Sequence, residues 1–372
     1  VIVRNGPLRG DFSTLRVNTD IEAVGAWLAE KASGSPHTAT SYRREAERLI
    51  LWASNQLGKS LSELAREDFL HFERFLENPQ PRKSWVMQRR YPRTSESWRP
   101  FLGPLSPDSR LQSQKILYSL MTYLVNTGWF RANPMPAPKA RKIIGFQPQL
   151  RSLSPDQWAS VWREVTNQST STNKDALLAA RERWIMAFFH EMGPRISEAC
   201  SAVMGDICPD PRGEGWDWHL QRKGGQSATL PLPYPALEEL WRFREALNLS
   251  IYPSPGETIP LIPSFATITK NGEVSPEKLK RLSKNQSYRL VVEAFRRTAD
   301  RIENDNAQSA SRLRLASTHW LRHTALRELA DSTEDLRMVQ MLGGHADINM
   351  SALYARQDSE ALRKALNKRS SQ

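Results

Sequence analysis

Two histidines, an arginine and a tyrosine stand at fixed offsets near the end of this 372-residue chain. His319 and Arg322 are three residues apart, so a helix would place them on one face. A pair of glycines follows, directly before His345, and Tyr354 comes nine residues after that histidine. Arginine binds phosphate with a planar fork of charged donors, and histidine binds phosphate or moves protons. These side chains could together hold a phosphodiester and attack it.

The tyrosine could act as the nucleophile of this set. Its hydroxyl has a pKa of about 10, so roughly a thousandth is ionised at neutral pH, and neighbouring cations favour the reactive phenolate. Plainer interpretations exist, since a lone His-x-x-Arg pair often serves surface or core hydrogen bonds and a lone tyrosine often packs. His319 and His323 have a spacing that suits zinc. Trp320, however, stands where the zinc-protease motif needs glutamate, so we expect no metal.

Two upstream segments supply further charged groups. After a Gly-Pro helix break, Arg195 is predicted in the first turn of the next helix, where backbone N–H groups favour an anion. Glu198 could hold that arginine or a histidine in place. Within residues 216–233, two strand-like runs flank a glycine turn, which predicts a β-hairpin with Lys223 at its tip. A mobile cation there could reach the leaving oxygen of a phosphate.

In this order and spacing, the charged residues resemble the motifs of the tyrosine recombinases, also called phage-type integrases. Pro194 departs from the leucine that the family often has there, but it touches no chemical group. His323 also occurs in such boxes, and we expect it to be structural. The positions that carry the resemblance span the C-terminal half of the chain and are Arg195, Glu198, Lys223, His319, Arg322, His345 and Tyr354.

The resemblance implies a role for each of these residues. Tyr354 attacks the scissile phosphate, forms a 3′-phosphotyrosyl link and frees a 5′-hydroxyl. Arg195 and Arg322 hold the non-bridging oxygens, and His345 binds the phosphate. Lys223 protonates the leaving oxygen and His319 assists deprotonation of the tyrosine, while Glu198 orients the set. No metal or other cofactor is implied, because the arginines neutralise the charge.

Composition agrees with a DNA-binding protein. The net charge of +12 and the isoelectric point of about 9.8 favour a polyanionic partner. No apolar run is long enough to span a membrane, no basic amphipathic helix stands out, and the first residues lack the apolar core of a signal peptide. Cys200 and Cys208 have neither zinc nor redox spacing and suggest a reducing compartment. We therefore expect a cytoplasmic protein that binds no membrane.

The predicted fold is mainly α. We expect a helical N-terminal DNA-binding domain, similar to the SAM-like core-binding domain of the family, and an α+β catalytic domain with a small antiparallel sheet. Helix-like periodicity covers residues 21–32, 38–57, 62–76, 112–126, 155–166, 174–191, 235–247, 276–304 and 359–369. The expected divisions are a tail at 1–19, the helical domain at 20–133, a basic proline-rich linker at 134–152 and the catalytic domain at 153–372.

Basic residues interleaved with aromatic ones mark residues 78–107. Such a mixture suits a nucleic-acid backbone and its sugars, although a solvated loop would have a similar composition. The aromatic side chains are Trp85, Tyr91, Trp98 and Phe101. The side chains that we expect to contact DNA, including those of the linker, are Arg43, Arg82, Lys83, Arg89, Arg90, Lys139, Arg141 and Lys142.

The resemblance predicts a site-specific recombinase acting on double-stranded DNA, for integration, excision or resolution of a mobile element or replicon. It also implies a homotetramer on two DNA sites, and leaves a monomer in free solution open. One alternative is type IB topoisomerase-like DNA relaxation, which uses the same chemistry without a partner site. The other is a sequence-specific DNA-binding protein that keeps the fold without cutting.

Overall fold

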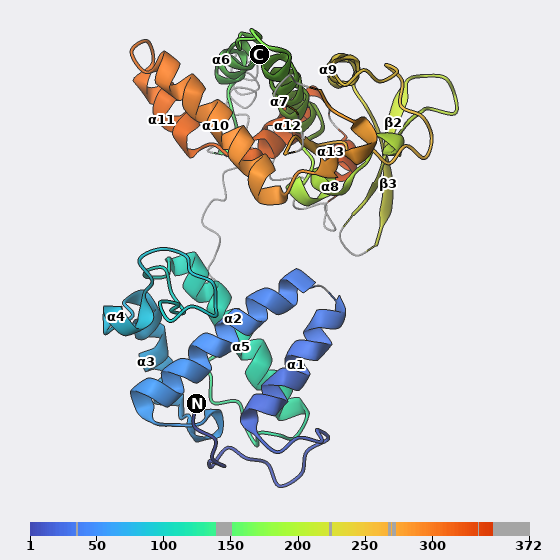
Figure 1. Ribbon diagram of the computed structural model, residues 1–372. Helices are drawn as coiled ribbons and strands as arrows, with labels where there is room; N and C mark the ends of the chain where they lie inside the picture. Colours follow the sequence, from blue (N-terminus) through green and yellow to red (C-terminus); the bar gives the residue numbers. More distant parts are fainter. Residues whose placement is uncertain are drawn as a thin grey trace, which may run out of the picture. The chain divides into compact units, whose positions relative to one another are not determined.

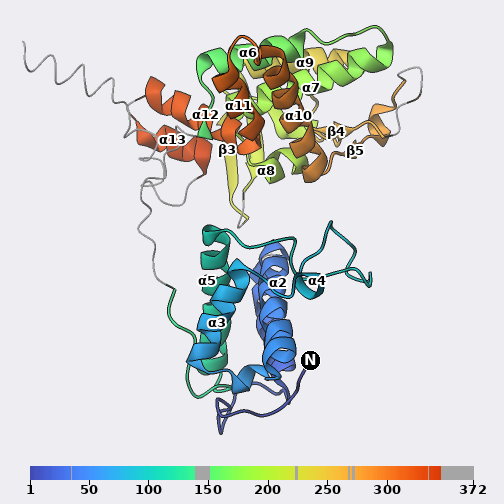
Figure 2. The same cartoon turned by 90° about the vertical axis from the view of Figure 1, so that its left-hand side faces the viewer.

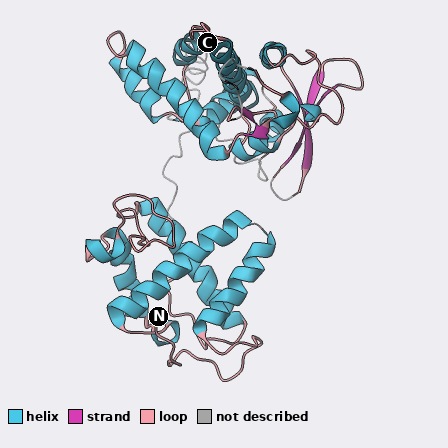
Figure 3. Ribbon diagram, viewed as in Figure 1, coloured by secondary structure: helices cyan, strands magenta, loops and turns pink. Residues whose placement is uncertain are grey.

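A computed structural model describes residues 1–34, 36–138, 151–222, 225–266, 269, 273–333 and 335–344. The chain divides into two compact units, Val1–Lys142 and Ile143–Gln372, each with its own hydrophobic core (Figures 1 and 2). Helices dominate both units, and the two small antiparallel sheets lie in the second (Figure 3). The predicted fold class, mainly α with a small antiparallel sheet, is confirmed.

Helices form the main regular structure of the first unit among its described residues. Ser106 caps α5 by accepting a hydrogen bond from the backbone N–H of Ser109 at 3.3 Å, and Pro107 takes the first helical position. This cap starts α5 five residues before the predicted residue 112. The helices are α1 (Asp20–Gly34), α2 (Pro36–Trp52), α3 (Arg66–Glu77), α4 (Arg82–Trp85) and α5 (Pro107–Asn126), with a π turn η1 (Ala53–Leu57) and a 3-10 turn η2 (Leu61–Glu63).

The residues before α1, predicted as a tail, lie along this first unit. The backbone N–H of Leu8 donates to the Ser62 carbonyl at 3.1 Å, which fastens the segment beside η2. The N–H of Gly10 donates to the Trp129 carbonyl at 3.0 Å, just beyond α5. We call residues 1–17 the N-terminal strap, because they connect the start of the unit to its last helix.

The second unit packs its helices around a core that includes Trp184, Phe188 and Trp218. Its helices are α6 (Pro155–Thr166), α7 (Asn173–Met192), α8 (Ile196–Ser201), α9 (Tyr234–Ala246), α10 (Lys284–Ile302), α11 (Ala307–Leu315), α12 (Thr318–Ser332) and α13 (Leu336–Gly343), with 3-10 turns η4 (Met204–Asp206) and η5 (Pro276–Lys278). Its strands are β1 (Ile207–Pro209), β2 (Trp216–Gln221), β3 (Ser227–Pro231), β4 (Pro263–Ser264) and β5 (Lys280–Arg281).

The predicted hairpin is confirmed. Strands β2 and β3 pair antiparallel, from Asp217 opposite Pro231 to Gln221 opposite Ser227, and β1 pairs with the other edge of β2. Figure 1 shows this sheet at one side of the second unit. The turn residues 223–224 lie outside the described part of the chain.

One predicted helix was wrong over its first residues. The run 276–304 begins with the turn η5 and the strand β5, which pairs with β4, and α10 starts only at Lys284. Ser283 caps α10 by accepting from the N–H of Gln286. Leu279 and Leu282 flank β5 and are buried, so their apolar side chains serve a strand and not the start of a helix.

Two further features concern the protein as a whole. Within the described residues, no helix is both long enough and apolar enough to cross a lipid bilayer. Cys200 and Cys208 are free thiols, and Cys200 is buried with its sulfur 3.2 Å from the Ser287 hydroxyl oxygen.

Candidate active site

Helix α12 places His319 and Arg322 one turn apart, as expected. The Arg322 side chain is buried, with 5% of the residue exposed. Its Nη1 donates to the carbonyl oxygen of Gly193 at 2.7 Å, and its Nη2 donates to the carbonyl oxygen of Gly343. Backbone oxygens from two other segments therefore fix the direction of this guanidinium.

Gly193 makes this arrangement possible. It ends α7 in the left-handed conformation, with φ +51°. A Cβ atom there would lie 3.0 Å from the Ala325 Cβ and 3.3 Å from the Arg322 Cα. Because no side chain intervenes, α7 and α12 approach closely enough for Arg322 to reach the last carbonyl of the turn.

Arg195 stands at the N-cap of α8, one residue before the helix begins, so the prediction that it lies in the first turn was wrong. Its backbone N–H donates to Glu198 Oε2, and its Nη1 donates to Glu198 Oε1, both at 2.8 Å. The Glu198 carboxylate is itself buried. This carboxylate takes the place at the helix start that the sequence suggested for a bound anion, and it holds Arg195.

The two arginines meet at the end of α13. Arg195 Nη2 donates to the carbonyl oxygen of Gly344 at 3.1 Å, next to the Gly343 carbonyl that Arg322 binds. The C-terminal end of a helix carries a partial negative charge, so cations are favoured there. Arg195, Glu198 and Arg322 thus form one cationic cluster although their helices lie far apart in the sequence.

His319 lies on the exposed side of this cluster. The ring keeps a face open to solvent, yet its crowded surroundings are the largest cause that lowers its pKa below the ordinary value, and the charges of Arg322, Arg151 and Arg195 lower the pKa further. The lowered pKa favours the neutral form of the His319 ring.

The two histidines of the zinc alternative lie next to each other on α12. The His319 and His323 rings meet edge to face with centroids 5.0 Å apart. Among the described residues, no group of three or more histidine, cysteine or acidic side chains is placed to hold a metal ion.

The remaining predicted catalytic residues, Lys223, His345 and Tyr354, lie outside the described residues. The structure instead adds a cation that the sequence did not single out. Arg222, directly before Lys223, donates through Nη2 to the Met341 carbonyl oxygen at 2.5 Å. The run of two basic residues at the hairpin was the available signal, but nothing in it showed which element Arg222 would contact.

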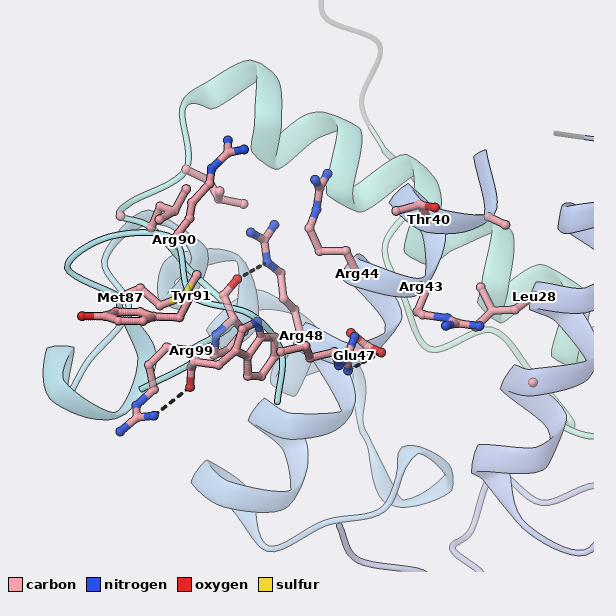
Figure 4. A pocket seen from close by; sticks show the side chains of 18 of the residues that line it. Leu28, Thr40, Arg43, Arg44, Glu47, Arg48, Met87, Arg90, Tyr91 and Arg99 are labelled. Atoms are coloured by element: carbon pink, nitrogen blue, oxygen red, sulfur yellow. Dashed lines mark hydrogen bonds and ion pairs between the residues drawn. The ribbon is translucent and has the colours of Figure 1, made fainter. Parts of the chain in front are cut away.

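A second candidate site is a hollow of about 920 Å³ in the first unit, between α2 and the loop that follows α4 (Figure 4). Figure 4 shows the guanidinium groups of Arg44, Arg48 and Arg90 pointing to the same side of this hollow. Arg43 and Arg90 are the two predicted DNA contacts that the structure brings into its lining. Both are exposed, and neither makes a hydrogen bond or ion pair with any residue that the structure describes.

Other arginines of the hollow hold the loop to α2. Arg93 pairs with Glu47 at 2.5 Å, and Arg48 donates to the Pro100 carbonyl at 3.1 Å. Trp85 and Phe101, two of the aromatic residues interleaved in this basic stretch, are buried in the core and are not exposed to a nucleic acid.

The other predicted DNA contacts of the first unit are exposed but do not line the hollow, and those of the linker lie outside the described residues. The first group comprises Arg82, Lys83 and Arg89, and the second Lys139, Arg141 and Lys142.

Known proteins resemble this chain in sequence. A sequence profile described as the phage integrase family matches residues 163–361. The tyrosine recombinase XerC of Xylella fastidiosa (strain M23) is 25% identical over 349 residues, covering 92% of this chain and 94% of its own length. The tyrosine recombinase XerD of Mycobacterium leprae (strain TN) is 23% identical over 356 residues, covering 95% of this chain and 96% of its own.

A solved structure of the Tn1549 transposon integrase, in complex with a circular-intermediate DNA, shares the fold. It aligns with a TM-score of 0.55 at 13% identity and covers 93% of this chain and 98% of the integrase chain.

Proposed function

Because this chain belongs to the phage integrase family, the tyrosine recombinases, we propose that it cuts and rejoins double-stranded DNA at specific sites through a 3′-phosphotyrosyl intermediate. The observation that carries the proposal is the convergence of Arg195 and Arg322 on neighbouring carbonyls at the end of α13. Guanidinium groups fixed in this way can stabilise the extra charge of a phosphoryl-transfer transition state without reorganising.

The proposed cleavage step is a displacement at phosphorus. The Tyr354 oxygen forms a bond to phosphorus, and the bond from phosphorus to the 5′ oxygen of the next nucleotide breaks. His319 accepts the tyrosine proton, since its lowered pKa keeps it neutral. Lys223 gives a proton to the 5′ oxygen, so a 5′-hydroxyl leaves. Arg195, Arg322 and His345 hold the phosphate, and Glu198 holds Arg195.

Rejoining is the reverse reaction with a 5′-hydroxyl from a second duplex. The phosphotyrosyl bond keeps the energy of the phosphodiester, so no nucleotide cofactor is needed. Exchange between two duplexes takes four strand cuts, which is why we propose a homotetramer on two sites.

The free thiols of Cys200 and Cys208 suit a cytoplasmic reaction on DNA of a mobile element or replicon.

The hollow supports a DNA-binding role for the first unit. Arg43 and Arg90 are exposed cations on a concave surface, and phosphate contacts supply most of the salt-dependent affinity for DNA. The relatives XerC and XerD are tyrosine recombinases, and the Tn1549 integrase was solved with DNA bound. We assign this hollow to the backbone of the duplex that is cut.

A suicide substrate tests the proposal. Genomic fragments that the protein retains are sequenced, and the shared site is made as a nicked duplex that loses its leaving strand after cleavage. We expect a covalent adduct on denaturing gels with the wild type and none with Tyr354→Phe, which keeps the ring but lacks the nucleophile. An adduct on any DNA, with relaxation of supercoils, would favour the topoisomerase alternative. No adduct on any DNA, despite selective binding, would leave only the non-cutting DNA-binding protein.

A further inference from the structure

Arg222 is the last described residue before the tip of the β2–β3 hairpin. Its backbone N–H donates to the Gln226 carbonyl at 2.7 Å, and its own carbonyl accepts from the N–H of Gly225 at 3.2 Å. Two hydrogen bonds from the other side of the hairpin therefore fix the backbone of this residue. A contact that anchors the Arg222 side chain therefore also restrains this end of the hairpin.

The Arg222 side chain reaches the end of α13, far away in the sequence. Its Nη2 donates to the carbonyl oxygen of Met341 at 2.5 Å and lies 3.4 Å from that of Leu342. These are carbonyls of the last helical turn, which carries the negative end of the helix dipole, and the Met341 carbonyl also accepts from the Gly344 N–H at 3.3 Å. Arg222 therefore caps α13 from outside.

Gly344 completes the contact. It ends α13 with φ +54°, and a Cβ atom at this position would overlap the Nη1 and Cζ atoms of Arg222. The guanidinium packs against a residue without a side chain, so the Gly-Gly pair serves the approach of Arg222 as well as the end of the helix.

The neighbours of Arg222 belong to the cluster described above. Burial is the largest cause that lowers the pKa of Arg222, the Glu198 carboxylate raises it, and the Arg195 charge lowers it. The pKa of an arginine is so high that the group stays charged even so. Arg222 is thus a third guanidinium at the end of α13, beside Arg195 and Arg322.

We propose that Arg222 is a positioning residue. It fastens the β2–β3 hairpin to the end of α13, so that the rate of cleavage depends on how these two elements are aligned. The inference rests on the proposed function, which assigns catalytic roles to Lys223 and His345. Lys223 directly follows Arg222 in the chain, and His345 directly follows Gly344. Arg222 acts through Lys223: it holds the hairpin so that the acid meets the leaving oxygen. It does not itself take part in a proton transfer.

A change of the leaving group can distinguish a positioning role of Arg222 from a general loss of structure in the variant. A suicide substrate with sulfur in place of the bridging 5′ oxygen releases a thiolate, which leaves without a proton. We expect Arg222→Ala to slow adduct formation on ordinary DNA about 10- to 100-fold, the effect of a misplaced catalytic group. On the sulfur-substituted DNA we expect it to stay within about threefold of the wild type, because the acid is then dispensable.

Three variants complete this experiment. Lys223→Ala is the positive control and should show the same rescue by sulfur. Arg222→Lys keeps the charge but lacks the fork, so its defect should be intermediate and should also be rescued. Arg212→Ala removes an exposed arginine from the β1–β2 turn and should behave as the wild type on both substrates.

A second measurement is independent of catalysis. In the DNA-free protein, hydrogen exchange of the amides in the last turn of α13 should speed up in Arg222→Ala and not in Arg212→Ala. If the wild type forms no adduct on any DNA, the proposed function fails first. If the wild type cuts but Arg222→Ala cuts normally, or is slowed equally on both substrates, the inference alone is overturned. Unchanged exchange in α13 would also overturn it.

Discussion

Both units contain clusters of arginines, but the arginines differ in what their side chains contact. In the hollow of the first unit, Arg43 and Arg90 are exposed and make no hydrogen bond or ion pair with described residues. In the second unit, backbone carbonyls and a buried carboxylate fix Arg195 and Arg322. Under the proposed function, this difference matches two different tasks. A DNA backbone contact tolerates a mobile side chain, because a phosphate is an accessible and repeated target. Stabilising a transition state demands that the donors be in place beforehand.

The largest expected effect comes from breaking the fixed cluster. Arg322→Ala should slow adduct formation roughly 10²- to 10³-fold, as loss of a preorganised donor does. It should also destabilise the protein by about 1–3 kcal/mol, because the Gly193 and Gly343 carbonyls lose their buried donor. Single-turnover cleavage and urea unfolding measure the two losses. Cleavage within about tenfold of the wild type would mean that Arg322 only supports the fold.

A smaller effect is expected in the hollow. Arg43→Ala and Arg90→Ala should each weaken DNA binding about fivefold near 0.15 M salt, since one phosphate contact contributes a salt slope of about 0.9. The dependence of log Kd on log salt should become shallower by that amount, while cleavage by fully bound enzyme stays unchanged. Titrations at several salt concentrations measure the slope.

Arg99→Ala is the matched control for the hollow. Arg99 lines the same cavity but donates to the carbonyls of Lys83, Glu96 and Trp98. Its loss should lower the thermal unfolding temperature and leave the salt slope nearly intact. An equal change of slope for all three variants would erase the distinction between exposed and bonded arginines.

The smallest effect concerns pH. Because the folded-state pKa of His319 is lowered, the ring stays neutral as the pH falls through the value of an unfolded histidine, about 6.5. As the pH falls, the histidine of the unfolded chain becomes protonated before the folded one does. His319 therefore lowers the stability of the folded protein below that pH and does not change it well above that pH. The cleavage rate should therefore hold through about pH 6.5 and fall only at lower pH. NMR titration of the ring checks the sign, and a raised pKa would contradict it.

Local signals predicted some elements closely. Helix α6 runs from Pro155 to Thr166 as expected, because Ser154 accepts from the N–H of Gln157 and the Gln157 side chain accepts from Ser154 in return. Strand β5 escaped prediction, because it exists only through pairing with β4, a partner many residues earlier. The composition of residues 78–107 did not reveal that two of its aromatic side chains, Trp85 and Phe101, are buried in the core.

In the candidate site, the sequence supplied the charged side chains and their order but not what they contact. Arg195 and Arg322 could be named because their types are chemically distinctive. Their acceptors, the carbonyls of Gly344, Gly193 and Gly343, are backbone atoms that every residue carries. No residue type marks such an acceptor, and Arg222 went unrecognised for the same reason.

The N-terminal strap has a consequence for how the first unit unfolds. Its hydrogen bonds link Ser62, in η2, to Trp129, beyond α5, so the first residues of the chain bridge two segments that are themselves distant in sequence. Shortening the protein from its start would cut this bridge and uncover the Trp129 side of the core. We infer that the opening residues and the last helix of the unit come apart together, as one cooperative step and not by fraying from an end.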